Sequence, residues 1–222
     1  MNDNRFPALS HLDEIRAAFA SGSSVVLVEA GTGSGKSTAL VRELARRETD
    51  PLPGLETVPQ KSDQGWYLSS TGTLQLVEPR RLAARTIAGF IDRELRDPGD
   101  DAPPWSLAGY ITRFDTRIAA DTRILAMTGG VFMRRLMDDP FLGSAECLVL
   151  DEFHERSLDT DFALAWSLGL LREFRPDLKL VILSATMDAA AVSEHVDRAL
   201  GRPACHVCSH DSTHMRRYPL DI

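Results

Sequence analysis

The sequence of 222 residues has few cysteines and no long apolar run. Three cysteines, Cys147, Cys205 and Cys208, are too few for a disulfide framework, which excludes the small disulfide-stapled secreted domains and favours a reducing compartment. No apolar stretch approaches the roughly 20 residues that cross a membrane as a helix. The charged residues Arg5 and Asp13 interrupt the segment where a signal peptide would need an apolar core. We therefore expect a cytoplasmic protein with no membrane partner.

Positive charge is also in short supply. The 25 Lys and Arg residues are outnumbered by 32 Asp and Glu residues, which gives a formal net charge of −7. This balance excludes a protein that is coated in positive potential, although a local arginine cluster in an acidic chain can still bind nucleic acid. Hydrophobic residues make up 43% of the chain, which is enough for the core of a globular domain.

Glycine is concentrated where the sequence carries its clearest motif, Ala-Gly-Thr-Gly-Ser-Gly-Lys-Ser at Ala30–Ser37. An apolar, β-branched run over 24–29 precedes it and a helical pattern over 38–47 follows it. A strand, a glycine-rich loop and a helix in this order are typical of a phosphate-binding loop. The alternative is a glycine-rich turn that merely caps a helix. Ala30 stands where the strict motif has Gly, and the looser form of the motif tolerates it.

Each part of this loop suits a triphosphate. Glycines let the backbone curl so that its N–H groups approach phosphate oxygens, and the helix that begins near Lys36 adds its positive dipole end. Lys36 would reach the β and γ phosphates, and the Ser37 hydroxyl would hold Mg²⁺. The predicted nucleotide-binding residues are Ala30, Gly31, Thr32, Gly33, Ser34, Gly35, Lys36, Ser37 and Thr38.

Strand-like and helix-like segments alternate along the chain. Period-2 or continuous apolar runs predict strands at 24–29, 73–78, 107–111, 123–127, 146–150 and 179–183. Helical spacing predicts helices at 9–19, 38–47, 80–96, 130–137, 158–174 and 188–200. This alternation indicates an α/β fold with a mostly parallel sheet and helices on both faces, and such sheets bind ligands at the carboxyl ends of their strands.

Polar segments directly follow five of the predicted strands, so we expect them to meet at one edge of the sheet. They are the loop at 31–37, Pro79-Arg80-Arg81, Thr128-Gly129, Asp151-Glu152 and Ser184-Ala185-Thr186. Asp151, at the end of a buried strand, is placed to hold the water shell of Mg²⁺, and Glu152 to orient and deprotonate an attacking water. His154 could relay contacts between sites. The alternative is that Asp151 and Glu152 only cap the next helix.

These motifs together resemble a known family. The ordered set Ala-Gly-Thr-Gly-Ser-Gly-Lys-Ser, Glu-Pro-Arg-Arg-Leu-Ala-Ala, Gly-Tyr-Ile-Thr-Arg-Phe-Asp, Thr-Gly-Gly-Val-Phe-Met-Arg, Asp-Glu-Phe-His-Glu-Arg-Ser and Ser-Ala-Thr-Met-Asp resembles the DEAH-box helicases of superfamily 2. The bacterial HrpB type likewise reads Asp-Glu-Phe-His. The resemblance spans about residues 9–200 and implies a RecA-like P-loop NTPase domain that uses ATP and Mg²⁺.

The resemblance also implies roles for individual residues. Lys36 and Ser37 would bind the triphosphate and Mg²⁺, Asp151 would be the carboxylate on the Mg²⁺ side, and Glu152 would be the base for hydrolysis. Coupling of hydrolysis to domain movement would fall to His154, Ser184 and Thr186. The residues that would face a single strand of RNA or DNA are Arg80, Arg81, Arg113 and Thr128.

These positions can also be explained by purely structural roles. Arg80 and Arg81 could be the solvated first turn of a helix, although cations there oppose the helix dipole. Arg113 could flank a surface turn, and Ser184 and Thr186 could be ordinary caps at the end of a strand.

Two departures from the family pattern stand out. Phe90 takes the place where family members commonly carry an Arg that stacks on the nucleotide base. The ring of Phe90 could stack on the base as well, but its spacing from Ile87 favours a place in the core, which leaves base preference open. The Gln-x-x-Gly-Arg-x-Gly-Arg motif of a second RecA-like domain does not occur in the sequence. We therefore expect a first RecA-like domain at 1–200 and a connector at 201–222 towards a second such domain in the same polypeptide, without which hydrolysis would be weak.

Two segments fall outside these motifs. The segment 49–72 is rich in Pro, Gly, Ser and Thr, which predicts a surface loop, most simply a tolerated insertion rather than a functional arm. Cys205 and Cys208, with His210 and His214, have a spacing that suggests a metal cluster, but an irregular connector is the simpler interpretation because there is no second Cys pair.

Rival functions remain at this point. A small-molecule kinase could use the same phosphate loop, and so could a nucleotide-gated binding module without turnover. A kinase gives no reason for Ser184-Ala185-Thr186 to stand at another strand end.

Overall fold

The central strands of the protein are apolar and buried on both faces, as strands of a parallel sheet covered by helices must be. The computed structural model describes residues 6–46, 68–69, 71–94, 101 and 103–209. Its strands are β1 (Val25–Glu29), β2 (Thr73–Glu78), β3 (Ala108–Ile111), β4 (Thr116–Arg117), β5 (Ile124–Thr128), β6 (Ala145–Leu150), β7 (Lys179–Ser184) and β8 (Cys205–Ser209).

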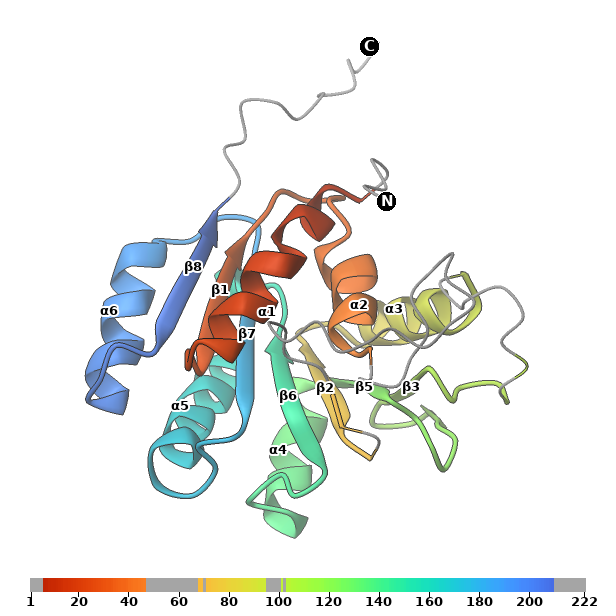
Figure 1. Cartoon of the computed structure of the whole chain (residues 1–222). Coiled ribbons are helices and arrows are strands. Elements are labelled where there is room, and N and C mark those ends of the chain that lie inside the picture. Colours follow the sequence, from red (N-terminus) through yellow and green to blue (C-terminus); the bar gives the residue numbers. More distant parts are fainter. Residues whose placement is uncertain (1–5, 47–67, 70, 95–100, 102, 210–222) are drawn as a thin grey trace.

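These strands form one sheet in the order β4-β3-β5-β2-β6-β7-β1-β8 (Figure 1). Every neighbouring pair is parallel except β3 with β4, which form an antiparallel hairpin. Parallel strands end at the same edge of a sheet, so the segments that follow β1, β2, β5, β6 and β7 converge there. The predicted α/β fold with a mostly parallel sheet is confirmed.

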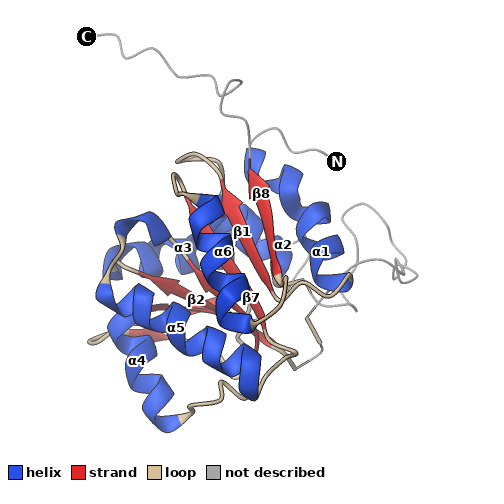
Figure 2. Cartoon of the chain, turned by 90° about the vertical axis from the view of Figure 1, so that its left-hand side faces the viewer, coloured by secondary structure: helices blue, strands red, loops and turns tan. Residues whose placement is uncertain are grey.

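Helices cover both faces of the sheet (Figure 2). The helical elements are η1 (Pro7–His11), α1 (Leu12–Ala20), η2 (Lys36–Leu40), α2 (Val41–Leu44), α3 (Arg81–Glu94), α4 (Gly129–Asp138), η3 (Phe153–Glu155), α5 (Leu158–Glu173) and α6 (Ala189–Leu200). Helices α1, α2 and α3 bury their apolar sides on one face, and α4, α5 and α6 on the other.

The alternation of side chains along β1 shows how one strand serves two cores. Val26 and Val28 pack with Ile15 of α1 on one face, whereas Val25 and Leu27 belong to the core beneath α4, α5 and α6. All four β1 side chains are fully buried. The strand that leads into the phosphate loop is thereby held from both sides, which fixes the position of the loop.

The segment after residue 200 differs from the sequence prediction. Residues 205–209 were expected to be irregular, but they form β8, which pairs in parallel with β1 from Val25 opposite Cys205 to Glu29 opposite Ser209. Asp197 of α6 holds the start of this strand, because its Oδ1 accepts hydrogen bonds from the N–H groups of Ala204 (2.8 Å) and Cys205 (3.0 Å). The sheet therefore continues past the expected domain boundary.

Some predicted features lie outside the described residues. They are most of the loop at 49–72, including Trp66 and Tyr67, and the tail from 210, including His210 and His214. Where the chain re-enters the described part, Leu68 is buried and its N–H donates to the Arg46 carbonyl at 3.2 Å. Among the described residues, no helix combines the length and apolar character needed to cross a membrane.

Candidate functional site

The glycine-rich loop follows β1 at the carboxyl edge of the sheet. The Ala30 N–H donates to the Ser184 carbonyl at 3.0 Å, which ties the start of the loop to the end of β7. Gly33 and Gly35 have φ angles of +77° and +86°, which side chains rarely tolerate. A Cβ at Gly35 would also lie 2.7 Å from Cδ1 of Phe6. The glycine at position 35 is therefore required by both conformation and packing.

Lys36 begins η2, a π-helical turn, directly after this loop. Its side chain is 4% exposed, and Nζ lies 3.2 Å from Oε1 of Glu152. A buried ammonium needs a charged or hydrogen-bonding partner, and Glu152 supplies it. The two residues that the sequence placed on either side of a triphosphate thus meet across the sheet edge.

Glu152 reaches this position through an uncommon backbone conformation. Its φ of 49° and ψ of 40° lie in the left-handed region, which costs a non-glycine residue on the order of 1–3 kcal/mol. Its N–H donates to Oδ1 of Asp151 at 2.8 Å, so Asp151 helps to hold the turn. Strain of this kind persists where the surrounding structure enforces it, as functional sites do.

Asp151 and Glu78 form a buried acidic pair behind Lys36. Both residues are 0–1% exposed, and neither Oδ2 of Asp151 nor Oε1 of Glu78 has a hydrogen-bond donor among the described residues. The pKa of Glu78 is raised from 4.5 to about 11. Burial is the largest cause, followed by the hydrogen bond with Asp151 and the negative charge of Asp151. Glu78 is therefore protonated at neutral pH, which keeps two negative charges from lying side by side in the buried site.

The predicted coupling residues lie beside this cluster. His154 approaches Glu152, with Nδ1 at 3.4 Å from Oε2, and the Ser184 hydroxyl donates to the Thr186 carbonyl at 2.8 Å. His154 and Thr186 both line a cavity of about 620 Å³ between η3, α5 and α6. His154 therefore both lines this cavity and approaches Glu152, although the residues that line the cavity include none from the phosphate loop.

A second cleft, of about 360 Å³, opens at the ends of β2 and β5. It is lined by Arg81, Arg113 and Thr128 of the predicted nucleic-acid residues, together with the start of α4. The Thr128 side chain does not cap this helix, so its hydroxyl is left for other contacts. A Cβ at Gly129 would lie 2.5 Å from the Cβ of Asp159, so only glycine lets α4 begin here. We call this cleft the arginine groove.

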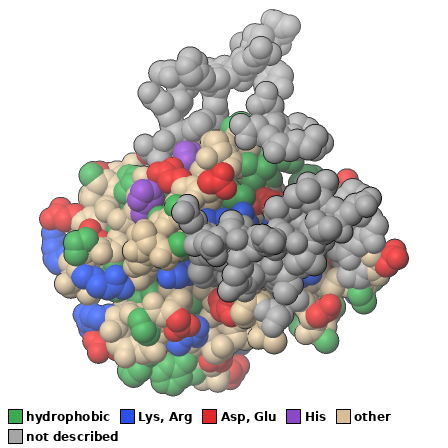
Figure 3. Space-filling view, in the orientation of Figure 1, with side chains coloured by type: hydrophobic (Ala, Val, Ile, Leu, Met, Phe, Trp, Pro, Cys, Tyr) green, Lys and Arg blue, Asp and Glu red, His purple; other side chains and the backbone are tan. Residues whose placement is uncertain are grey.

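Arg80 is the predicted nucleic-acid residue that does not line the arginine groove. Its side chain is 72% exposed and its Nη2 lies 2.7 Å from Oε1 of Glu155. Figure 3 shows acidic and basic side chains interspersed over the coloured part of one face, in keeping with the net charge of −7. The positive charge of the arginine groove is therefore local.

Several residues at these sites were not singled out from the sequence. Glu78 stands at a strand end, the same signal that identified Asp151, and could have been found by applying that rule to β2. Phe114 is 78% exposed between the guanidinium groups of Arg81 (5.6 Å) and Arg113 (5.1 Å), an arrangement that depends on the β3–β4 hairpin. Arg134 of α4 lines the arginine groove and carried no signal beyond its charge.

Phe90 lies in a different environment from the one its spacing predicted. Ile87 packs against the core, but Phe90 is half-buried and lines an open cleft with Trp105 and Tyr110, between α3 and β3. The opposite wall of this cleft is formed by the β3–β4 hairpin, which contributes Tyr110 and Arg117.

Comparison with known proteins places these features in context. A family model described as DEAD/DEAH box helicase matches residues 13–195. An ATP-dependent RNA helicase HrpA homolog of Haemophilus influenzae is 35% identical over 198 residues, and the ATP-dependent RNA helicase HrpB of Escherichia coli is 39% identical over 164 residues. These alignments cover 89% and 73% of this chain, but the chain spans only 13% and 17% of the length of those relatives.

Solved structures agree. The crystal structure of the Escherichia coli DEAH/RHA helicase HrpB superimposes with a TM-score of 0.68 at 33% identity, over 91% of this chain and 22% of that one. A second structure, of the E. coli DExH-box NTPase HrpB, gives a TM-score of 0.69 at 31% identity.

Proposed function

Because the chain belongs to the DEAD/DEAH box helicase family, we propose that it is the ATP-binding motor domain of a nucleic-acid-stimulated ATPase. The observation that carries this proposal is the meeting of Lys36 and Glu152 at 3.2 Å beside the buried Asp151. In the proposed division, the first RecA-like domain extends from residue 1 past residue 200 to the end of β8, because β8 pairs in register with β1. Its three cysteines, all free, suit the cytoplasm.

Nucleotide binding is assigned to the loop and the turn that follows it. The backbone of residues 30–38 would surround the phosphates, and the Lys36 ammonium would leave Glu152 to contact the β and γ phosphates. This exchange is favourable because one buried charge partner replaces another and Lys36 is never left unpaired. Glu152 is released by the same step.

The residues present also fit a magnesium ion. Asp151 offers a fully buried carboxylate oxygen, Oδ2, that no protein donor satisfies among the described residues, and Ser37 offers a hydroxyl. Hard oxygen ligands of this kind are what Mg²⁺ prefers. The ion, when bound with the nucleotide, would neutralise charge that develops on the phosphate oxygens.

Glu152 is the proposed base for hydrolysis. Once Lys36 turns to the phosphates, the Glu152 carboxylate can accept the proton of an attacking water at the γ phosphate. His154 lies 3.4 Å from the other carboxylate oxygen and would orient it. Ser184 and Thr186 would then transmit the change, since the Ser184 carbonyl is bonded to the start of the phosphate loop.

The arginine groove is the proposed contact with nucleic acid. Arg81 and Arg113 would bind the phosphate backbone, and the N-terminus of α4 beside Thr128 adds the positive end of a helix dipole. Such contacts give affinity without base preference. Because the relatives are named RNA helicases, we propose single-stranded RNA as the substrate, with DNA as the alternative.

We further propose that a second RecA-like domain in the same polypeptide completes the ATPase. Arginine residues supplied from such a domain typically contribute about 10³–10⁵ in rate, so this chain alone should bind nucleotide but hydrolyse it slowly.

Single-turnover phosphate release from ATP, with and without single-stranded RNA or DNA, tests the proposal. We expect release to be faster with RNA, and to fall about 10²–10⁴-fold in Glu152→Gln while nucleotide affinity is retained. Glu173→Gln, on the exposed end of α5, is the matched control and should change neither quantity. Phosphate transfer to a metabolite would favour a kinase instead, and nucleotide binding with no Glu152-dependent release would favour a binding module.

A further inference from the structure

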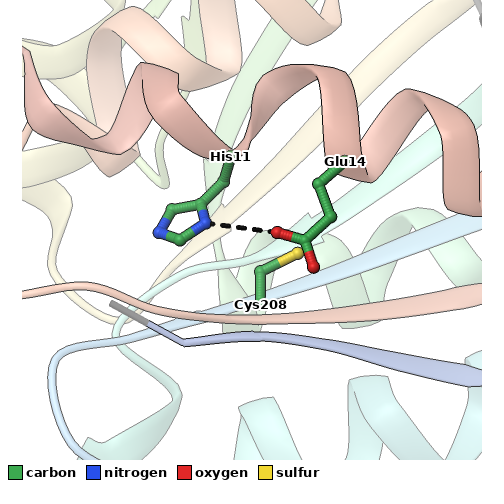
Figure 4. Close-up of side chains that lie close together, drawn as sticks. All are labelled: His11, Glu14 and Cys208. Carbon is green, nitrogen blue, oxygen red and sulfur yellow. Dashed lines mark ion pairs between the residues drawn. The ribbon is translucent and has the colours of Figure 1, made fainter. Parts of the chain in front are cut away.

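Side chains suited to binding a metal ion come together where α1 crosses β8, and none of them belongs to the phosphate loop. His11 closes η1, Glu14 lies in the first turn of α1 and Cys208 lies near the end of β8. One ligand atom from each lies within 4.8 Å of the other two, and the three side chains point toward a common space (Figure 4). His11 and Cys208 are buried, whereas Glu14 is exposed.

The pleat of β8 decides which residues take part. His206 and Cys208 are two positions apart and share the face toward α1, whereas Cys205 packs into the core on the other face. The two sulfurs of the Cys205-x-x-Cys208 pair therefore cannot bind one ion together. The spacing in the sequence suggested that pair, but in the folded chain the partners of Cys208 are His11 and Glu14 from the N-terminal helical segment.

The chemistry of the three side chains selects the kind of ion. Imidazole nitrogen, carboxylate oxygen and thiolate sulfur form a mixed set that suits Zn²⁺ and not Mg²⁺ or Ca²⁺, which take oxygen ligands. Ligand atoms around a tetrahedral Zn²⁺ are about 3.3–3.8 Å apart, given bonds of about 2.0–2.3 Å. Atoms that already lie within 4.8 Å need only a small inward movement of the side chains.

We propose that His11, Glu14 and Cys208 form a zinc site, with water at the fourth position. The side chain of Glu14 is 46% exposed, so water reaches the cluster from that side.

His206 is a positioning residue in this site. Its Nε2 lies 2.8 Å from Oε1 of Glu14, while Oε2 of the same carboxylate faces Nδ1 of His11 at 3.6 Å. This contact fixes the orientation of the Glu14 carboxylate between the two imidazole rings. His206 thereby turns one carboxylate oxygen toward the cluster, as partners of metal ligands commonly do.

The position of the site gives zinc a structural consequence. The Ala8 N–H of η1 donates to the Ser34 carbonyl of the phosphate loop at 3.0 Å, and Phe6 packs against Gly35. A bond from His11 through the metal to Cys208 would join this N-terminal segment to the edge strand. We expect zinc to raise the unfolding temperature of the chain, because it binds the folded arrangement and not separated residues.

Metal titration of the chain, after treatment with a chelator, tests the proposal. We expect one Zn²⁺ per chain in competition with a chromophoric chelator, and Co²⁺ to give a thiolate-to-cobalt charge-transfer band. Cys208→Ser should lose the band and Cys205→Ser, the matched control on the same strand, should keep it. His206→Gln should bind Zn²⁺ about 10–100-fold more weakly and still show the band.

Other results would overturn the site. They are a wild-type chain that binds no more Zn²⁺ than Cys208→Ser, a band that survives in Cys208→Ser, or a band that is lost in Cys205→Ser. If Cys208→Ser does not fold, His11→Gln provides the same comparison, because it removes a ligand and leaves the cysteine. A folded His11→Gln variant with unchanged Zn²⁺ affinity contradicts the proposal.

Discussion

The two halves of the carboxyl edge of the sheet hold their charged groups in opposite ways. Beside β1 and β6, Lys36 and Asp151 are buried, and Glu152 is held in a left-handed conformation. Beside β2 and β5, Arg81 and Arg113 are exposed, and their guanidinium groups stack on the exposed Phe114. The charged groups of the first half are held in place without a ligand, whereas the guanidinium groups of the second half are exposed to water.

This difference matches what each half is proposed to bind. Buried charges act in a low dielectric and cannot relax, so they suit a reaction in which charge develops at one place. Exposed arginines are screened by salt and adapt to a flexible chain, which suits binding to a phosphate backbone without reading its sequence. Substitutions in the buried half should therefore have larger effects than those in the exposed half.

Among the substitutions that change binding, removal of the Lys36 ammonium should have the largest effect on nucleotide affinity. We expect Lys36→Ala to weaken nucleotide binding by about 1.5–3 kcal/mol, roughly 10- to 150-fold, because hydrogen bonds to charged groups have that strength. The acidic residues Asp151 and Glu152 would then face the phosphates without a counter-charge. Titration with a fluorescent ATP analogue measures the affinity.

Lys179 is the matched control for this experiment. It is also partly buried, but it begins β7 at the opposite edge of the sheet, where Nζ donates to the Ser23 carbonyl at 3.4 Å. Lys179→Ala should leave nucleotide affinity unchanged. Equal losses in both variants would contradict the proposed nucleotide site and would remove the difference between the two halves.

The next effect concerns pH and the pair formed by Glu78 and Asp151. The pKa of Glu78 is raised from 4.5 to about 11 in the folded chain, so the folded state holds a proton that the unfolded state releases. Its contribution to stability is complete below pH 4.5 and is lost as pH rises towards 11. The free energy of unfolding should fall by up to about 1.4 kcal/mol per pH unit in this range.

Glu78→Gln keeps a neutral hydrogen-bond donor beside Asp151 and removes this titration. Denaturant unfolding between pH 6 and pH 9 should therefore show a shallower dependence on pH in the variant, with a relative gain in stability at the alkaline end. Identical slopes in the two proteins would show that Glu78 is not protonated in the folded chain.

The sequence predicted the buried half of the edge better than the exposed half. A buried parallel strand must be an apolar run, so the sequence pattern indicates where β1 and β6 end, and the residues that follow both strands lie at one edge of the sheet. Lys36 and Glu152 meet for that reason. The chemistry of this half is local to strand ends, which is what a sequence pattern records.

The remaining features depend on contacts between distant segments. The contact of Phe114 with Arg81 of α3 forms only because the β3–β4 hairpin folds back toward that helix. The proposed zinc site brings Glu14 close to Cys208, which follows it by 194 positions in the sequence. No periodicity encodes such distances. The run Cys205–Ser209 is short and mixed in polarity, so the sequence predicts no strand there, and pairing with β1 decides its structure.

In the exposed half, a single substitution should change the salt dependence of RNA binding more clearly than it changes the affinity for RNA. Removal of one phosphate contact lowers the slope of log K against log salt by about 0.7 for a single strand. We expect this change in Arg113→Ala, with binding to labelled single-stranded RNA measured by anisotropy over a salt series. Arg198→Ala is the matched control, because Arg198 is also exposed but lies on α6 and does not line the arginine groove. Equal slopes in Arg113→Ala and the wild type would exclude the arginine groove as the binding surface.

Substitution of Arg80 should have the smallest effect on RNA binding, because Arg80 already forms an ion pair with Glu155. An exposed ion pair of this kind contributes less than about 1 kcal/mol, and it lowers the charge that Arg80 can offer to RNA. We expect Arg80→Ala to change the salt slope less than Arg113→Ala does. Glu155→Gln should strengthen RNA binding slightly by releasing Arg80.

A double-mutant cycle separates that release from the mere loss of a negative charge. If Glu155→Gln acts by freeing Arg80, its gain should disappear in the Arg80→Ala background, whereas a general charge effect would persist there. A persistent gain would leave Arg80 outside the nucleic-acid surface and restrict that surface to the arginine groove. A gain that disappears would extend the exposed half toward η3, and so toward Glu152 and the site of hydrolysis.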